Sequence, residues 1–155
     1  MKKEQLIIRK ASEHDMQVLL QFEQEIIKAE LPYDITLKTE PTWYHDLPKM
    51  ITAENIYLIV AELDNKIIAS GYARITNAEH YLKHDKHAYL GMMYVVPEYR
   101  GKGVNKKIMD ELIAWANKKN VHEFRLLVYD ENLPAINAYT KAGFVKHVVE
   151  MRMSL

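Results

Sequence analysis

The feature that most constrains this chain is an apolar segment that leads through a basic, glycine-containing turn into a helix. Residues 90–96 are apolar, Gly101 and Gly103 follow, and an amphipathic helical pattern then continues to about Lys119. The first N–H groups of a helix have no partner within it, and the helix dipole is positive at that end. Glycines let a backbone approach an anion closely. The segment therefore predicts a site for phosphate groups, such as those of a pyrophosphate.

Two familiar phosphate loops are excluded by their spacing. A P-loop needs G-x-x-x-x-G-K-[ST], and Gly101 and Gly103 are too close together to supply it. A dinucleotide-binding fingerprint needs a third glycine where Lys106 stands. The turn instead resembles the acetyl-coenzyme A loop of the GCN5-related N-acetyltransferase (GNAT) family, whose pattern is [QR]-x-x-G-x-[GA]. Arg100 and Gly103 fill its first and central positions, and Asn105 stands in place of the final small residue.

A second block is similar to a later motif of the same family, N-x-x-A-x-x-x-Y-x-x-x-G-F. Its fixed positions are occupied by Asn132, Ala135, Tyr139, Gly143 and Phe144. The block also has the signals of a short helix, because asparagine caps a helix start and glycine adopts the left-handed conformation after a helix end. We therefore predict a left-handed Gly143. The two motifs occur in the family's order, and a looser similarity extends from Leu6 to Leu155.

Composition limits the class of protein. The chain has 155 residues, of which 48% are hydrophobic and 27% charged, as in a soluble globular domain. Lys plus Arg equals Asp plus Glu, at 21 each, so no overall field attracts nucleic acid or membrane. There is no cysteine, which excludes disulfides, thiolate nucleophiles and cysteine metal sites. Without an apolar segment for export or insertion, we expect a cytoplasmic monomer or homodimer with no nucleic-acid or membrane partner.

Strand and helix patterns alternate along the chain. We expect strands at 6–9, 56–63, 67–76, 88–96 and 124–129 and from residue 144, and helices at 12–30, near 43–52, from the glycine loop to 119 and at 133–142. Residues 64–66 are typical of a hairpin turn, and residues 77–86 of a polar loop or ragged helix. This order favours an α/β fold with a mixed sheet, in a single domain over residues 1–155. The family resemblance implies a twisted sheet flanked by helices, with two central parallel strands that splay apart.

The resemblance also implies where acetyl-coenzyme A binds. In the family, the pantetheine arm lies between the splayed strands and hydrogen-bonds to main-chain atoms of the first one. Here that strand includes Met93 to Val96, with Tyr94 and Val96 the expected positions. The hydroxyl of the motif tyrosine, Tyr139, would protonate the leaving thiolate, and a phenol with a pKa of about 10 is protonated at neutral pH. The predicted coenzyme-binding residues are Tyr94, Val95, Val96, Arg100, Gly101, Lys102, Gly103, Val104, Asn105, Lys106, Asn132 and Tyr139.

Several of these residues also have a purely structural explanation. Lys106 precedes Asp110 by four residues and can form a surface ion pair, which leaves its amide as the functional group. Tyr139 can be an ordinary core aromatic, since aromatic side chains on the inner face of a short helix usually are. Asn132 can be a helix cap alone. The aromatic residues spread over the expected acceptor pocket are Tyr33, Trp43, Tyr44, Tyr72 and Tyr81.

The general base is left open. Some family members carry a glutamate at the start of the strand before the loop, and Tyr89 stands at that position. An ordered water chain can replace a base, and the side-chain candidates are Glu79, His80, His84, Asp85, His87, Glu25 and Glu30. His80 and His84 have a spacing that metal ligands use on a helix, but Tyr81 replaces the glutamate of H-E-x-x-H. We therefore expect no metal.

The sequence predicts an enzyme that transfers an acetyl group from acetyl-coenzyme A to a primary amine, by direct attack in a ternary complex. The alternative is a non-catalytic coenzyme A-binding or regulatory module, which the missing acid at Tyr89 and the unusual Asn105 favour. A third hypothesis is a histidine-rich metal-binding protein. The acceptor, a small molecule or a peptide, is not predicted, because its pocket is built from variable segments.

Overall fold

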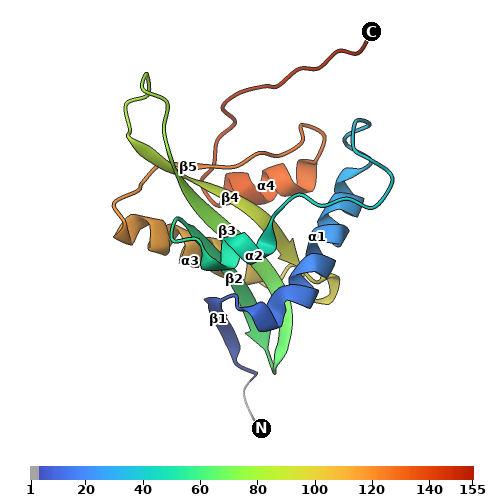
Figure 1. The fold of residues 1–155 in the computed structure, drawn as a ribbon, viewed down its shortest axis with the longest axis vertical. Helices are drawn as coiled ribbons and strands as arrows, with labels where there is room; N and C mark the ends of the chain where they lie inside the picture. The colour runs from blue at the N-terminus through green and yellow to red at the C-terminus, as the bar shows by residue number, and fades with distance from the viewer. Residues whose placement is uncertain (1–3) are drawn as a thin grey trace.

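A five-stranded sheet forms the centre of the structure, a computed structural model that describes residues 4–155 (Figure 1). The strands lie in the order in which they follow along the chain: β1 (Leu6–Lys10), β2 (Ile56–Leu63), β3 (Lys66–Asn77), β4 (Lys86–Val95) and β5 (Phe124–Arg125). β1 to β4 pair antiparallel, and β5 pairs parallel to β4. The predicted mixed α/β sheet is confirmed.

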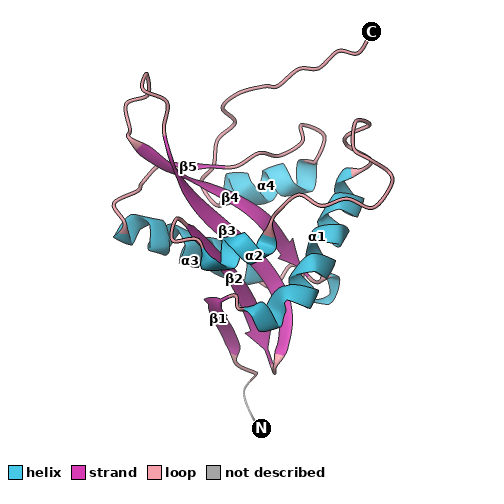
Figure 2. Ribbon diagram, viewed as in Figure 1, coloured by secondary structure: helices cyan, strands magenta, loops and turns pink. Residues whose placement is uncertain are grey.

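Helices cover both faces of this sheet (Figure 2). They are α1 (Met16–Glu30), α2 (Leu47–Thr52), α3 (Val104–Lys118) and α4 (Leu133–Lys141), with one-turn 3-10 helices η1 (Glu13–Asp15) and η2 (Pro97–Tyr99). Leu58 and Val60 belong to the core under α1 and α2, whereas Ile59 between them belongs to the core under α3. Because successive side chains of a strand point to opposite faces, one apolar strand fills two separate cores.

The turns on either side of β3 follow from their residues. Asp64 and Asn65 join β2 to β3 with φ angles of +49° and +64°, which asparagine and aspartate tolerate in tight hairpins. The predicted hairpin turn is therefore confirmed. Residues 78–85 join β3 to β4 as a loop, in which the Ala78 N–H donates to the Asp85 carbonyl at 2.8 Å.

Two strand predictions are wrong. The strand expected at 124–129 is limited to Phe124–Arg125, and no strand follows Phe144 within the described residues. Leu127 has 73% of its surface exposed and Val149 has 80%, so these apolar side chains do not pack. A strand needs a neighbour that exchanges main-chain hydrogen bonds, and among the described residues no strand pairs with residues 126–129 or with those after Phe144. The alternating pattern therefore predicted extended backbone, visible for the C-terminal segment in Figure 1, but not a ladder.

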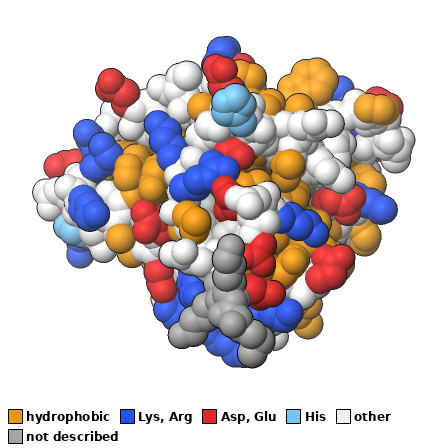
Figure 3. Space-filling model, turned by 90° about the horizontal axis from the view of Figure 1, so that it is seen from below, with side chains coloured by type: hydrophobic (Ala, Val, Ile, Leu, Met, Phe, Trp, Pro, Cys, Tyr) orange, Lys and Arg blue, Asp and Glu red, His pale blue; other side chains and the backbone are white. Residues whose placement is uncertain are grey.

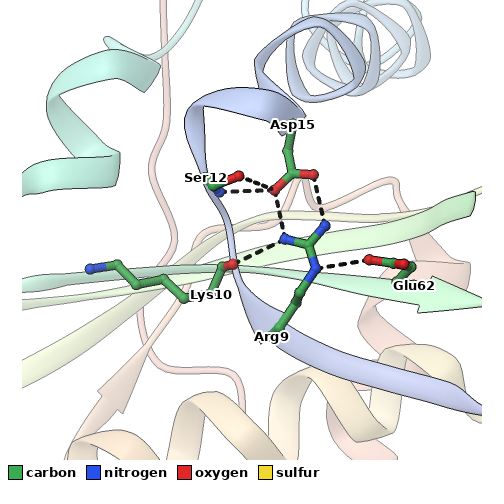
Figure 4. A network of polar contacts seen from close by, with 5 residues as sticks. All are labelled: Arg9, Lys10, Ser12, Asp15 and Glu62. Carbon is green, nitrogen blue, oxygen red and sulfur yellow. Dashed lines mark hydrogen bonds and ion pairs between the residues drawn. The ribbon is translucent and has the colours of Figure 1, made fainter. Parts of the chain in front are cut away.

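A polar network joins β1 and β2 to the start of α1 (Figure 4). Arg9 donates from Nη1 and Nη2 to the Asp15 carboxylate at 2.8 and 2.9 Å, and from Nε to Glu62 at 2.8 Å. Asp15 also accepts the main-chain N–H of Ser12 at 2.8 Å, which completes a capping box. The hydrogen bonds from Arg9 are the main cause that holds the pKa of Asp15 below its usual value. The network therefore fixes how α1 leaves the sheet.

Charges of both signs are mixed on the surface. Figure 3 shows one face of the molecule, on which Lys and Arg side chains lie beside Asp and Glu side chains and apolar groups. This face has no extended region of one sign, in agreement with the balanced composition. Within residues 4–155, no helix has both the length and the apolar character that a membrane crossing requires.

Candidate active site

β4 is the strand along which the candidate site is built. It pairs with β3 up to Val95, but with β5 only at Ala88 and Tyr89. Beyond Tyr89 its second edge therefore has no strand partner. The register with β3 is interrupted near Met92, whose φ is +51°, and the Ser70 hydroxyl donates to the Met92 carbonyl at 2.9 Å. The bulge therefore lies in the part of β4 that no longer pairs with β5.

Two hydrogen bonds define the direction of the main-chain groups after this bulge. The Val96 N–H donates to β3 at 2.9 Å, whereas the Val95 carbonyl accepts from Arg100 Nε at 2.8 Å. Neighbouring residues of a strand direct their N–H and C=O groups to opposite sides, so Met93 and Val95 face the open edge. Tyr94 and Val96, the expected main-chain positions, therefore face β3 instead of the open edge. A bulge that the sequence pattern does not reveal has shifted the alternation of main-chain groups by one residue.

The turn after β4 forms an open cradle of main-chain donors. Gly101 and Gly103 have φ angles of +74° and +79°, and a Cβ on either would meet no atom within 4 Å. Side chains rarely adopt this conformation, so the turn requires glycine. No side chain caps α3, which leaves the first-turn N–H groups of Val104, Asn105 and Lys106 without a helical partner. The predicted anion site therefore has the donors and the open space that a pyrophosphate requires.

The basic side chains around this turn have different surroundings. The Arg100 guanidinium lies 5.6 Å from the centre of the Tyr94 ring, and Lys102 lies over a neighbouring tyrosine ring at 5.5 Å. Lys106 Nζ pairs with Asp110 at 2.6 Å, as its spacing indicated. Lys106 is therefore engaged in an ion pair, whereas Arg100 and Lys102 have no carboxylate partner among the described residues.

Tyr139 lies on α4 and packs, partly buried, against the core cluster that includes Leu90 of β4. Its ring packs edge-on against Phe144 with centroids 6.0 Å apart. Burial raises the pKa of Tyr139, and the negative charge of Glu30 on α1 adds to the shift. The phenol is therefore protonated at neutral pH, as a proton donor must be. The pKa of Tyr89 is also raised by burial, so this residue does not replace the missing carboxylate as a base.

Both ends of α4 agree with the helix signals in the sequence. Asn132 Oδ1 accepts the N–H of Ala135 at 3.4 Å at the start of the helix. Gly143 follows its last turn with a φ of +108°, and the Phe144 N–H donates to the Tyr139 carbonyl at 3.0 Å. The predicted left-handed glycine is confirmed, and this C-terminal motif fixes the orientation of the turn that carries Tyr139.

The segment between α1 and α2 brings acidic and tyrosine side chains toward α4. The Tyr44 hydroxyl donates to Glu30 at 2.6 Å, and the Tyr129 hydroxyl donates to Asp34 at 2.8 Å. Two of the aromatic residues expected in an acceptor pocket, Trp43 and Tyr81, are each 73% exposed. They are therefore too open to line a pocket. The candidates that remain are Tyr33, Tyr44 and Tyr72.

The histidine-rich loop lies at the other end of β4. His87 precedes Met93 by six residues, which is about 20 Å along a strand. His84 Nε2 is 3.3 Å from His87 Nδ1, whereas His80 packs against Tyr81. Within residues 4–155, no three His, Cys, Asp or Glu side chains converge in a way that suits a metal. The loop candidates for the base, which do not reach the bulge directly, are Glu79, His80, His84, Asp85 and His87.

A buried acid–histidine pair was missed from the sequence. His45, just before α2, places Nδ1 2.7 Å from Glu23 Oε2 on α1. Glu23 has no exposed surface. A signal was present, because Glu23 lies four residues after Leu19 and four before Ile27, on the apolar face of an amphipathic helix. A carboxylate at such a position needs a specific partner.

Comparisons with known proteins give one family and several relatives. The acetyltransferase (GNAT) family matches residues 20–144. Thialysine N-epsilon-acetyltransferase from Mus musculus is 40% identical over 58 residues, which are 37% of this chain and 34% of that protein. The similarity therefore spans about a third of the length of the curated relatives.

Solved structures agree on the fold. A mutant of the BH1408 protein from Bacillus halodurans has a TM-score of 0.85 at 23% identity, covering 96% of this chain and 99% of that one. A predicted acetyltransferase from Clostridium acetobutylicum, crystallised with acetyl-CoA, has a TM-score of 0.71 at 21% identity, covering 97% and 96%. At these identities the likeness shows the fold alone. With the family match over residues 20–144 and this fold, the chain belongs to the acetyltransferase (GNAT) family.

Proposed function

We propose that this chain is an acetyl-CoA-dependent N-acetyltransferase that acts on a primary amine. The observation that carries the proposal is the edge of β4 without a strand partner, which the glycine cradle follows directly along the chain. Main-chain groups of Met93 and Val95 face this edge of β4, and the free N–H groups at the start of α3 lie in the turn that follows it. A strand edge suits the amide-rich pantetheine arm, and a helix N-terminus suits its pyrophosphate.

The residues divide the work between binding and proton transfer. Arg100, Lys102 and the first-turn N–H groups of α3 bind the phosphates, while Gly101 and Gly103 keep the cradle open. The Met93 and Val95 main chain holds the pantetheine arm, with the thioester near the bulge. Tyr139 donates its proton to the departing sulfur, and Asn132 caps the helix that carries it. Neutral amine attacks the thioester directly, since the chain has no cysteine to form an acyl-enzyme.

The family relative named for thialysine suggests where to begin the search for the acceptor. Thialysine carries a primary amine at the end of a flexible side chain. Glu30 and Asp34 stand near α4, where they favour a positively charged acceptor. The panel of amines should therefore include amino acids with side-chain amines, polyamines, aminoglycosides and peptide N-termini.

Release of free thiol from acetyl-CoA, measured with this panel, tests the proposal. We expect turnover with at least one amine and formation of the corresponding acetamide by mass spectrometry. Coenzyme binding measured by calorimetry, without thiol release on any amine class, would instead favour the non-catalytic coenzyme A-binding module. Absence of both binding and turnover would contradict the assignment of the cradle.

The remaining expectations concern the setting in which the enzyme works. We infer a single catalytic domain, a monomer or homodimer, in the cytoplasm and without nucleic-acid or membrane partners. The balanced charge of 21 basic and 21 acidic residues and the absence of cysteine support this inference. Gel filtration with light scattering, and fractionation of cells that produce the protein, test it.

A further inference from the structure

The buried pair of Glu23 and His45 lies close to the bulge of β4. The His45 ring packs edge-on against Tyr72 of β3, with centroids 5.3 Å apart. Tyr72 in turn reaches across to β4, because a Cβ on Gly91 would clash with the Tyr72 hydroxyl oxygen. One tyrosine ring therefore separates the imidazole from the β4 backbone immediately before Met92. This is the side of the sheet that α1 and α2 cover.

Glu23 holds His45 in one orientation. A single oxygen, Oε2, accepts both the main-chain N–H of His45 at 3.0 Å and its ring Nδ1 at 2.7 Å. A carboxylate can only accept, so Nδ1 carries the hydrogen. The other ring nitrogen, Nε2, then has a free lone pair, and no hydrogen bond from it to another described residue is present. The His45 side chain keeps 18% of its surface exposed, and Nε2 is not a fully buried atom.

The second oxygen of Glu23 is the unusual part of the arrangement. Glu23 Oε1 is buried and has no hydrogen-bond partner, and no Lys or Arg forms an ion pair with this carboxylate among the described residues. A buried negative charge without a positive partner is unfavourable, and it becomes compensated when the adjacent imidazole takes up a proton. The pair is therefore built to stabilise an imidazolium, as carboxylates do behind the histidine of catalytic triads.

We propose that His45 is the general base of the reaction, and that Glu23 is its positioning residue. This inference rests on the function proposed above. The acceptor ammonium gives one N–H proton to His45 Nε2, directly or through one water, and His45 later releases it to solvent. The neutral amine then forms the C–N bond as the C–S bond breaks. The second proton passes from the new amide nitrogen to solvent, the sulfur takes one from the Tyr139 hydroxyl, and solvent returns a proton to the Tyr139 oxygen, so that protons and charges balance.

Other titratable groups around His45 do not fit this role. Glu30 on α1 is occupied by the Tyr44 hydroxyl, and Asp46 next to His45 pairs with Lys49 of α2 at 3.1 Å. Burial raises the pKa of Tyr72 on β3, which keeps that phenol protonated. Arg74 lies beyond the Tyr72 ring at 5.9 Å and is always charged. The Glu23–His45 pair is therefore the arrangement in this region that keeps a ring nitrogen with a free lone pair.

The test must distinguish a catalytic base from a histidine whose only role is to hold the segment before α2 against α1. His45→Asn keeps a side-chain donor for Glu23 and the main-chain hydrogen bond, and removes the ring with its basic nitrogen. We expect kcat at neutral pH to fall by about 10²-fold, with unchanged coenzyme affinity and melting temperature. The deficit should shrink as pH rises, because more of the amine is then already neutral. The matched control is His14→Asn, an exposed histidine on η1, which should leave activity unchanged.

Glu23→Gln gives a second, independent readout. Without the carboxylate the imidazolium is less stable, so the fall of kcat/KM on the acid side should move to lower pH. The inference is overturned when the His45→Asn variant keeps wild-type turnover. It is also overturned when turnover falls only in proportion to the loss of folded protein, without a change in the pH profile. Absence of acetyl transfer by the wild-type chain refutes the proposed function itself, which is a different result.

Discussion

Replacing Tyr139 by phenylalanine removes one hydroxyl from α4 and leaves the ring in place. The contact with Phe144, at 6.0 Å between centroids, should survive. Burial and the charge of Glu30 shift the pKa of this tyrosine, with no hydrogen bond to the hydroxyl contributing, so its removal leaves no buried partner unpaired. We therefore expect the free energy of unfolding to change by less than about 0.5 kcal/mol, and coenzyme affinity to be retained.

The effect on turnover should be much larger. A positioned acid contributes roughly 10²-fold or more to a rate, which corresponds to about 2.7 kcal/mol of transition-state stabilisation at 1.36 kcal/mol per factor of ten. Because the pKa of Tyr139 is raised, the donor form persists through neutral and mildly alkaline pH. The wild-type kcat should therefore show no loss from ionisation of this residue below about pH 10.

Steady-state thiol release with the best amine of the panel measures this effect, in parallel with calorimetric titration of coenzyme A and thermal unfolding. Tyr81→Phe is the matched control, because it deletes the same atom from a residue that is 73% exposed in the β3–β4 loop. A loss of less than about threefold in kcat for Tyr139→Phe would show that the ring only packs, and would refute the proton-donor role.

Three further predictions test the cradle, the end of α4 and the start of α1. Gly103→Val should weaken coenzyme A binding more than Arg100→Ala does, because the valine fills the open space of the cradle, whereas one exposed charge contributes about 1–2 kcal/mol. Calorimetry measures the affinity of both variants, and unchanged affinity in a folded Gly103→Val variant contradicts the cradle. Gly143→Ala should lower the free energy of unfolding by about 1 kcal/mol, since its φ of +108° is strained for alanine and its surroundings are open; an unchanged melting temperature argues against that strain. Asp15→Asn should cost about 1–2 kcal/mol at neutral pH through lost hydrogen bonds from Arg9. The folded-state pKa of Asp15 lies below its usual 3.8, so its contribution is complete above that value and is lost as pH falls through the folded pKa. Urea unfolding at several pH values should show the wild type and the variant converging in acid, and a constant difference contradicts the ion pair.

Features that depend on neighbouring residues in the chain could be predicted from the sequence. The glycine conformations at 101, 103 and 143 are of this kind, as is the cap at Asn132. Each follows from steric limits or hydrogen bonds that act over three to five residues. The order of the elements and the family could also be recognised from the sequence, because both depend on two local motifs with fixed spacing.

Features that depend on pairing between distant segments could not be predicted in the same way. The alternating residues after Arg125 and after Phe144 have strand propensity, but propensity supplies no partner for the ladder. Which main-chain groups of β4 face the open edge depends on a bulge against β3. The bulge shifts the alternation by one residue, so that Met93, and not Tyr94, faces that edge.

The fold family and the position of the glycine turn follow from the amino-acid sequence, because short-range steric and hydrogen-bonding rules act on adjacent residues. Which groups face the open edge of β4, and which acid meets which histidine, depend on the tertiary fold. Glu23 and His45 are 22 residues apart, and nothing in either local sequence specifies the other. Their contact arises because α1 and the segment before α2 pack on the same face of one sheet, where burial leaves the carboxylate dependent on that single histidine.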